Sequence, residues 1–165
     1  MAEITKAAWL AEGKKLGANA SENCWLIGEW LVAGEQTFLG TVPTSKKAKK
    51  KYFTARKANW EALMDDAAKV TGLRDNTLRQ YARVVRRGLR VEALSFAHHL
   101  EVMRCHTVDA KTNKKNFDAV AAKKILQKAQ ARTWTVARTR EEMQKQFPSA
   151  VPSNETPLQK AKRLL

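Results

Sequence analysis

The sequence contains little glycine, proline or cysteine, and it has no long hydrophobic run. Of its 165 residues, 7 are glycine, 4 are proline and 2 are cysteine. Two isolated cysteines, Cys24 and Cys105, do not form a disulfide framework, so we expect both to be reduced packing residues. No apolar run reaches the roughly 18 residues that a membrane span needs, and MAEITKAAWLAEG lacks the apolar stretch of a signal peptide. We therefore expect no membrane contact and a cytoplasmic, nucleoid-associated location.

Clusters of residues suited to catalysis or metal binding are also lacking. No glycine-rich phosphate-binding loop is present. His98 and His99 are adjacent, and neighbouring side chains on a helix point about 100° apart, so they do not readily share one ion. Asp65 and Asp66 diverge in the same way, and Glu61 does not complete a nuclease site with them. We predict no cofactor, no metal site and no enzymatic activity; a nucleic-acid-processing enzyme is the least favoured alternative.

Acidic residues are few in comparison with basic ones. The chain has 31 lysines and arginines against 16 aspartates and glutamates, a net charge of +15. The excess lies mainly after residue 75, where 19 basic residues face 7 acidic ones. Such a charge favours an anionic partner through long-range attraction and counterion release. We predict that this partner is double-stranded DNA; RNA stays open, because basic helices also bind A-form grooves by shape.

Apolar residues recur at helical spacing along most of the chain, and no segment shows sustained period-two alternation. This pattern predicts an all-α fold, a compact multi-helix domain with a central helix-turn-helix and a C-terminal helical hairpin. Helices are expected at about 4–13, 22–34 after a cap at Ser21, 54–70, 74–87, 95–104 with a cap at Ser95, 117–131 after a cap at Asn116, and 135–147. Gly88 is expected to end the fourth helix.

The same pattern divides the chain into four segments. Residues 1–52 carry the N-terminal helices and a lysine-rich loop with five lysines at 46–51. Residues 53–92 form the helix-turn-helix unit, and 93–147 form the C-terminal helices. Residues 148–165 contain three prolines and few aromatic residues, and we expect a flexible tail there.

The central helix-turn-helix rests on the spacing of residues 61–87. Ala68 supplies the small residue that faces the partner helix, and Gly72, four residues later, allows the chain to reverse. Apolar residues at fixed offsets then fill the corner and pack the second helix back: Leu73, Leu78 and Tyr81. These positions agree at once, so the match is fairly specific.

The second helix of this pair is predicted to insert into the major groove of DNA. Its outward stripe consists of Arg79, Arg83 and Arg86, and no acidic residue occurs between 79 and 87. Like charges four residues apart cost an isolated helix roughly a few tenths of a kcal/mol, and nearby phosphates would reverse that sign. Polar and cationic residues of this helix, with three lysines of the 46–51 loop, are the predicted DNA contacts: Arg74, Asn76, Thr77, Arg79, Gln80, Arg83, Arg86, Arg87, Lys47, Lys49 and Lys50.

Two further segments each have two interpretations. The C-terminal basic segment forms either a second helix-turn-helix that contacts DNA or a structural helical hairpin, because its turn lacks glycine. Its cations are Lys123, Lys124, Lys128, Arg132, Arg138 and Arg140. Trp25 and Trp30 belong either to the core or to a homodimer interface, and we predict a homodimer because their helix is strongly apolar.

Four motifs follow one another in a recognisable order: WLIGEWLVAGE, TGLRDNTLRQYARVVRR, LSFAHHLEV and ARTWTVARTREEM. This order resembles the LmbU-like family of bacterial transcriptional regulators over most of residues 20–145. More weakly, the fifth helix resembles the helical DNA-binding region of ParB-type partition proteins. The first resemblance implies a sequence-specific regulator with its helix-turn-helix at 61–87. The alternative is a nucleoid, partition or replication accessory protein that binds DNA with little sequence preference.

Overall fold

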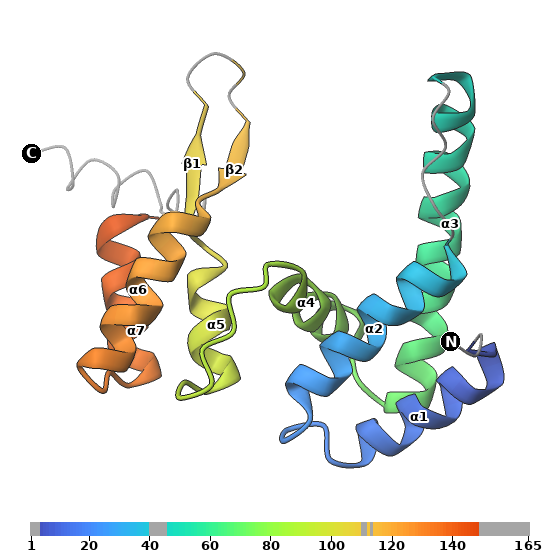
Figure 1. Cartoon of the computed structure of the whole chain (residues 1–165), viewed down its shortest axis with the longest axis horizontal. Helices are drawn as coiled ribbons and strands as arrows, with labels where there is room; N and C mark the ends of the chain where they lie inside the picture. The colour runs from blue at the N-terminus through green and yellow to red at the C-terminus, as the bar shows by residue number, and fades with distance from the viewer. Residues whose placement is uncertain (1–3, 40–45, 110–111, 113, 149–165) are drawn as a thin grey trace, which may run out of the picture. The chain divides into compact units, whose positions relative to one another are not determined.

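The structure is a computed structural model that describes residues 4–39, 46–109, 112 and 114–148, with the backbone alone for 46–51. In these residues the chain forms seven α-helices and one short antiparallel sheet, which confirms the predicted all-α fold (Figure 1). The elements are α1 Lys6–Ala18, α2 Cys24–Phe38, α3 Lys46–Thr71, α4 Asp75–Arg86, α5 Phe96–Val102, β1 His106–Val108, β2 Lys115–Phe117, α6 Ala119–Ala131 and α7 Val136–Gln146.

The chain divides into two compact units, Met1–Gly88 and Leu89–Leu165. The first contains α1 to α4, and the second contains α5, the two strands, α6 and α7. The segment predicted as the helix-turn-helix, 53–92, lies mainly in the first unit. The predicted tail, 148–165, lies outside the described residues except for Pro148.

Two tryptophans join α1 to α2 in the first unit. The rings of Trp9 and Trp30 stack with their centroids 4.1 Å apart and their planes 13° from parallel. Each indole N–H donates to the backbone carbonyl of the other tryptophan, at 3.0 Å from Trp9 and 2.9 Å from Trp30. Trp30 is therefore a core residue, which agrees with the interpretation that assigned it to the core.

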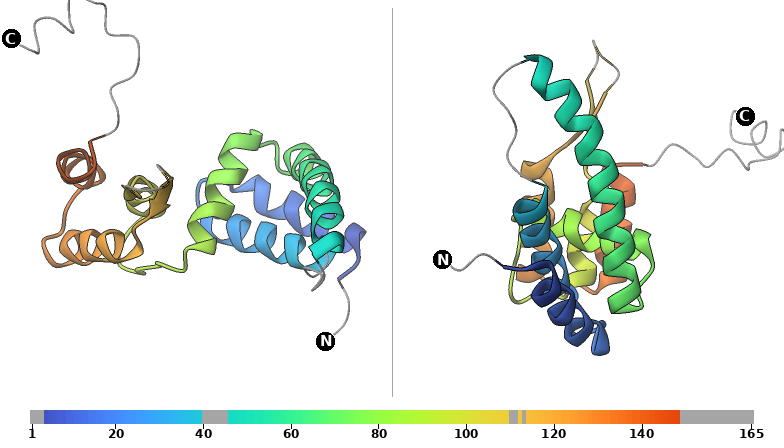
Figure 2. Two further views of the ribbon diagram at one scale, coloured as in Figure 1. Left: turned by 90° about the horizontal axis from the view of Figure 1, so that it is seen from above. Right: turned by 90° about the vertical axis from the view of Figure 1, so that its right-hand side faces the viewer.

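The rest of the first core is built by α2, α3 and α4. Its buried residues include Ile27, Leu31, Leu63, Met64, Ala67, Leu78 and Ala82. α2 makes its most extensive contact with α4, and the two backbones approach closely at Gly28, where an added Cβ would lie 2.8 Å from the Tyr81 carbonyl oxygen. The first turns of α3 extend beyond the other helices of this unit (Figures 1 and 2).

The second unit is a small helical unit with a β-hairpin inserted in it. α5 packs against α7 and α6, and α6 and α7 form the predicted C-terminal hairpin. Strands β1 and β2 pair in antiparallel register, His106 opposite Phe117 and Val108 opposite Lys115. The apolar centre of this unit consists of Val102, Met103, Cys105, Ala122, Ile125, Leu126, Ala129 and Met143.

Three local predictions were wrong. Residues 46–51 belong to α3 and not to a loop, because Lys and Ala are good helix formers and no glycine or proline interrupts them. The β-hairpin at 106–117 was not predicted, since strands of three residues are too short to show an alternating pattern. The caps also differ: α2 follows Asn23 instead of Ser21, and α6 follows Asp118, whose side chain accepts from the Ala121 N–H at 2.9 Å.

In the residues that the structure describes, no helix combines the length and the apolar composition that a membrane span requires.

Both cysteines are free thiols in different surroundings. Cys105 is fully buried with its Sγ 3.4 Å from the Met143 Sδ, and burial, with the nearby Asp118 charge, raises the pKa of its thiol to about 12. Cys24 is half-buried at the start of α2. We expect iodoacetamide at pH 8 to alkylate Cys24 and to spare Cys105 in the native protein, because only the thiolate reacts. Peptide mass spectrometry measures both sites; in urea both should react, and equal native rates would contradict the prediction.

Candidate nucleic-acid interface

Helices α3 and α4 are joined by a short turn of the kind that a helix-turn-helix requires. Gly72 has φ +70°, a left-handed conformation that glycine adopts without strain, and its N–H donates to the Ala68 carbonyl at 2.9 Å. The next helix begins at Asp75 after Arg74, whose carbonyl accepts from the N–H groups of two residues in the first turn. Gly88, with φ +62°, follows the end of α4 in the same way. The two turn glycines thus lie where they were predicted.

The inner face of α4 is held against α2 and α3. Leu78 and Ala82 are fully buried. The hydroxyl of Tyr81 accepts from the Cys24 Sγ at 3.4 Å, and burial with this hydrogen bond raises the pKa of Tyr81 to about 12. Val84 is buried as well, which narrows the exposed arc of α4.

Arg79 does not extend freely from the outer face, as the predicted stripe requires. Its Nε donates to the Asp75 Oδ2 at 2.6 Å, and its Nη2 donates to the Glu61 Oε2 of α3. These hydrogen bonds, the one to Asp75 first, raise the pKa of Arg79 further. The guanidinium is therefore directed toward two carboxylates of the same unit.

Arg86 is engaged in the same manner at the other end of the helix. Its Nη2 and Nε donate to the Glu35 Oε2 of α2 at 2.6 and 3.0 Å, and its Cζ lies 4.8 Å from the centroid of the Trp60 ring. Positions 79 and 86 are seven residues apart and so lie on one side of α4. The expectation of a stripe without acidic partners is wrong for Arg79 and Arg86, because Asp75 at the start of α4, Glu61 of α3 and Glu35 of α2 supply those partners.

The exposed arc of α4 carries a mixture of amides and cations. Its exposed members among the predicted DNA contacts are Arg74, Asn76, Gln80, Arg83 and Arg87, and Thr77 is half-buried beside them; Arg86 is also exposed, but its guanidinium is bonded to Glu35. Guanidinium groups can bond guanine edges and phosphates, and Asn and Gln amides can bond adenine edges. The backbone of Lys47, Lys49 and Lys50 lies in the first turns of α3, and their side chains lie outside the described residues.

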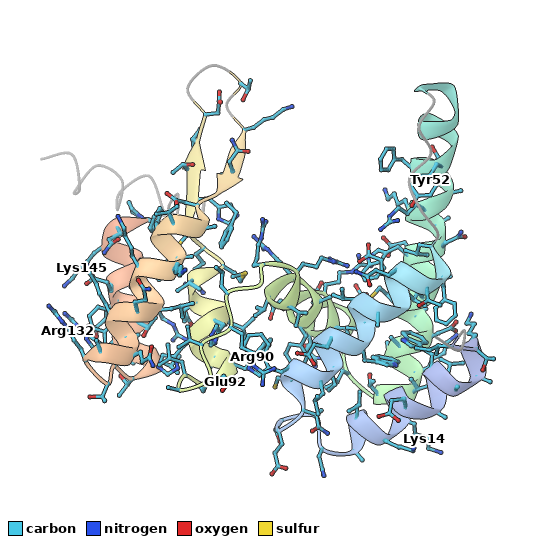
Figure 3. All side chains as sticks on the ribbon, in the orientation of Figure 1. Lys14, Tyr52, Arg90, Glu92, Arg132 and Lys145 are labelled. Atoms are coloured by element: carbon cyan, nitrogen blue, oxygen red, sulfur yellow. The ribbon has the colours of Figure 1, made fainter. Side chains whose placement is uncertain are left out.

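The second unit presents basic side chains from α6, from α7 and from the segments between its elements. Lys123, Lys124, Lys128 and Arg132 are exposed; Figure 3 marks Arg132 beyond the end of α6. The two α7 arginines predicted with them are engaged by carboxylates. Arg138 bonds Glu141 at 2.8 Å, and Arg140 bonds the buried Glu101 of α5 at 2.7 Å, which also raises the pKa of Arg140.

Histidines and carboxylates do not gather into a metal site in the part of the chain that the structure describes. The ring nitrogens of His98 lie 2.8 Å from the Ser95 Oγ and 2.9 Å from the Trp134 carbonyl. Two of the carboxylates considered for a nuclease site are bonded to cations instead: Glu61 bonds Arg79, and Asp66 pairs with Lys6 at 2.7 Å.

Sequence reasoning missed a group of residues where α2, α3 and α4 meet. A pocket of about 240 Å³ is lined there by Glu35, Phe53, Arg56, Lys57, Trp60 and Arg86. Only Arg86 was predicted as a functional residue. The spacing of Arg79 and Arg86 was the one available signal, because it places both on the side of α4 that faces other helices.

Comparison with protein-family models, curated proteins and solved structures found no match to this chain. The likeness to LmbU-like regulators and to ParB-type proteins therefore stays a prediction from the sequence.

Proposed function

We propose that this protein binds double-stranded DNA through the exposed arc of α4, with α3 and the Gly72 turn holding that helix as in a helix-turn-helix. The observation that carries the proposal is the arrangement of α4 itself. One face is buried against α2 and α3, and the other exposes amide and guanidinium groups within a basic protein of net charge +15. The role is one of binding, without catalysis.

The proposal differs from the sequence prediction in which arginines contact DNA. Arg79 and Arg86 are bonded to carboxylates of the same unit, so we assign them to holding α4 in place. We assign base contacts to Asn76, Gln80 and Arg83 because these side chains are exposed on the side of α4 opposite the buried Leu78 and Ala82, and phosphate contacts to Arg74 and Arg87 at the ends of the arc. A protein of this kind acts as a transcriptional regulator on the bacterial nucleoid, and a homodimer would read a palindromic site. Leu26, half exposed on the apolar α2, offers one contact for such a dimer.

A second candidate function is DNA coating with little sequence preference. The distribution of charge favours it: residues 1–88 hold 16 basic and 9 acidic residues, and 89–165 hold 15 and 7. Both units are therefore basic, and the exposed α6 lysines add phosphate contacts of the sequence-independent kind. Selection of bound duplexes from a random pool separates the two functions. A regulator yields a consensus bound about a thousandfold more tightly than shuffled DNA, whereas a coating protein binds both equally.

Replacing Arg83 tests the assignment of α4. We expect Arg83→Ala to weaken binding to the selected duplex by about 1–3 kcal/mol and to relax the preference at one base pair, because a guanidinium fork on a guanine edge is lost. Fluorescence anisotropy with the consensus and its single-base variants, at two salt concentrations, measures both effects.

The matched control is Lys14→Ala. Lys14 is exposed on α1, where it is labelled in Figure 3, so the variant removes the same charge from the same unit. It should weaken all duplexes slightly and alike. If Arg83→Ala behaves no differently from Lys14→Ala, α4 is not the recognition helix.

A further inference from the structure

The pocket between α2, α3 and α4 has chemistry that the proposed DNA contacts do not use. It has a volume of about 240 Å³, smaller than a typical drug-sized site. α3 contributes four of its lining residues, and one each comes from α2 and α4. It lies next to Tyr52, on the part of α3 that Figure 3 labels. A small polar ligand is therefore the size class to consider.

A single carboxylate organises the cations of this pocket. The Oε1 of Glu35 accepts from the Arg56 Nη2 at 2.8 Å, and its Oε2 accepts from Arg86. The Glu35 side chain is only 17% exposed, so these charge-assisted bonds form in a partly desolvated place. Arg56 also bonds the Tyr52 hydroxyl and lies over that ring. The two guanidinium groups are thus held side by side before any ligand arrives.

The charges at the pocket do not cancel. Arg56, Arg86 and Lys57 supply three positive charges, and Glu35 supplies one negative charge. The excess of two matches a phosphate monoester, which carries about −1.5 to −2 at pH 7. A guanidinium has five N–H donors in a planar fork, and Glu35 takes only two of those of Arg86. The pocket is therefore suited to a phosphate in both charge and donor geometry.

An aromatic side chain lies exposed at the same pocket. Phe53 is 54% exposed, while one face of Trp60 is covered by Arg86. Exposed aromatic rings beside cations are the common means of binding a nucleobase, because every base has a flat face to stack. A nucleobase stacked on Phe53 and a phosphate bound to the arginines would both belong to one small ligand, a nucleotide.

We propose that this pocket binds a nucleoside monophosphate, with the phosphate against Arg56, Arg86 and Lys57 and the base stacked on Phe53. The ligand is a free nucleotide or a terminal nucleotide of a strand, since both present the same chemistry. The inference goes beyond the proposed function, because it uses none of the outer residues of α4. It assigns Arg86 to the pocket, where the sequence had assigned it to DNA.

Titration of the full-length chain with nucleotides tests the proposal. Isothermal titration calorimetry should show saturable binding of at least one of AMP, GMP, CMP and UMP, and weaker binding of its nucleoside and of ribose 5-phosphate, since each lacks one half of the recognised structure. Lys57→Ala and Phe53→Ala should each weaken that binding by about five- to tenfold. Both side chains are exposed, so the fold should survive, and circular dichroism verifies this.

Two controls separate the outcomes. Lys14→Ala and Arg83→Ala should bind the nucleotide as the unaltered protein does, so a failure of the DNA proposal leaves this one standing. Competition by a 5′-phosphorylated trinucleotide, but not by its unphosphorylated form, identifies a strand end as the ligand; competition by neither identifies the free nucleotide. The proposal would be overturned if none of the four monophosphates bound saturably, or if Lys57→Ala and Phe53→Ala both bound the nucleotide as tightly as the unaltered protein does. The cluster would then be only a structural link between helices.

Discussion

Trp30→Ala should lower the free energy of unfolding of the first unit by about 3–5 kcal/mol, the cost of emptying a well-packed tryptophan site. Small domains have only about 5–15 kcal/mol of stability in total. The loss is therefore a large fraction of the stability of this unit. The loss is this large because Trp30 makes several different contacts with α1.

Trp30 makes three kinds of contact with α1 that alanine cannot make. Its ring stacks on Trp9, its indole N–H donates to the Trp9 carbonyl, and its six-membered ring lies so close to Gly13 that an added Cβ there would be 2.2 Å from Cζ2. The reverse contact also exists, because a Cβ at Gly34 would lie 2.5 Å from the Trp9 Nε1. Each tryptophan thus fills a space that a glycine of the other helix leaves open.

Urea unfolding followed by far-ultraviolet circular dichroism measures the change, and hydrogen exchange of peptides from α1 and α2 localises it. The matched control is Trp25→Ala on the same helix, where the side chain is half-buried, and a smaller loss is expected. Peptides from α6 and α7 should exchange as in the unaltered protein, because they belong to the other unit. A loss below about 1 kcal/mol for Trp30→Ala would show that the pair does not determine the stability of this unit.

Much of the fold could be predicted because the relevant signals are local. Gly72 and Gly88 end α3 and α4 where a left-handed residue is needed, and the Thr135 side chain accepts from the Arg138 N–H as a cap of α7. Such signals need only a few neighbouring residues. The β-hairpin escaped prediction because its strands are held by pairing with each other, and three residues are too few to carry a pattern of their own.

The candidate site was predicted less well, because its decisive partners are distant in sequence. Glu35 lies 51 residues before Arg86 and 21 before Arg56, yet it bonds both. A helical wheel treats α4 alone, so it shows which residues share a side but not which carboxylates of α2 and α3 meet that side. Arg79 and Arg86 illustrate the consequence: the wheel placed them together correctly and gave them the wrong surroundings.

The second unit should lose stability as the pH falls from about 7 toward 5, with His99 as a main cause. His99 is 1% exposed, and burial, followed by the nearby charges of His98 and Arg90, lowers the pKa of its ring, while the hydrogen bond to Ser95 opposes that shift. Its Nε2 accepts from the Val91 N–H at 2.9 Å, and its Nδ1 lies 2.9 Å from the Ser95 carbonyl, which can only accept. The native ring is therefore neutral, with its proton on Nδ1.

The direction of the effect follows from the pH at which His99 takes up a proton in the unfolded state and in the native state. In the unfolded chain His99 has an ordinary pKa near 6.5, about that of a free histidine. In the native protein protonation is disfavoured, because a proton on Nε2 would displace the Val91 N–H. Below pH 6.5 the unfolded state thus binds a proton that the native state does not, and the stability falls by up to about 1.4 kcal/mol per pH unit until the lowered native pKa is reached. Above pH 7 the contribution of His99 is fully present.

Urea unfolding of the full chain at several values between pH 5.5 and 7.5 measures this slope, with hydrogen exchange of α5 peptides to assign it to the second unit. His99→Gln should be less stable at pH 7.5 but should show a flatter dependence on pH, because the titrating group is gone. His106→Gln, on the β-hairpin, is the matched control for the loss of an imidazole elsewhere in the same unit. An unchanged slope in His99→Gln would mean that other groups, and not the ring buried between Val91 and Ser95, determine the acid sensitivity of this unit.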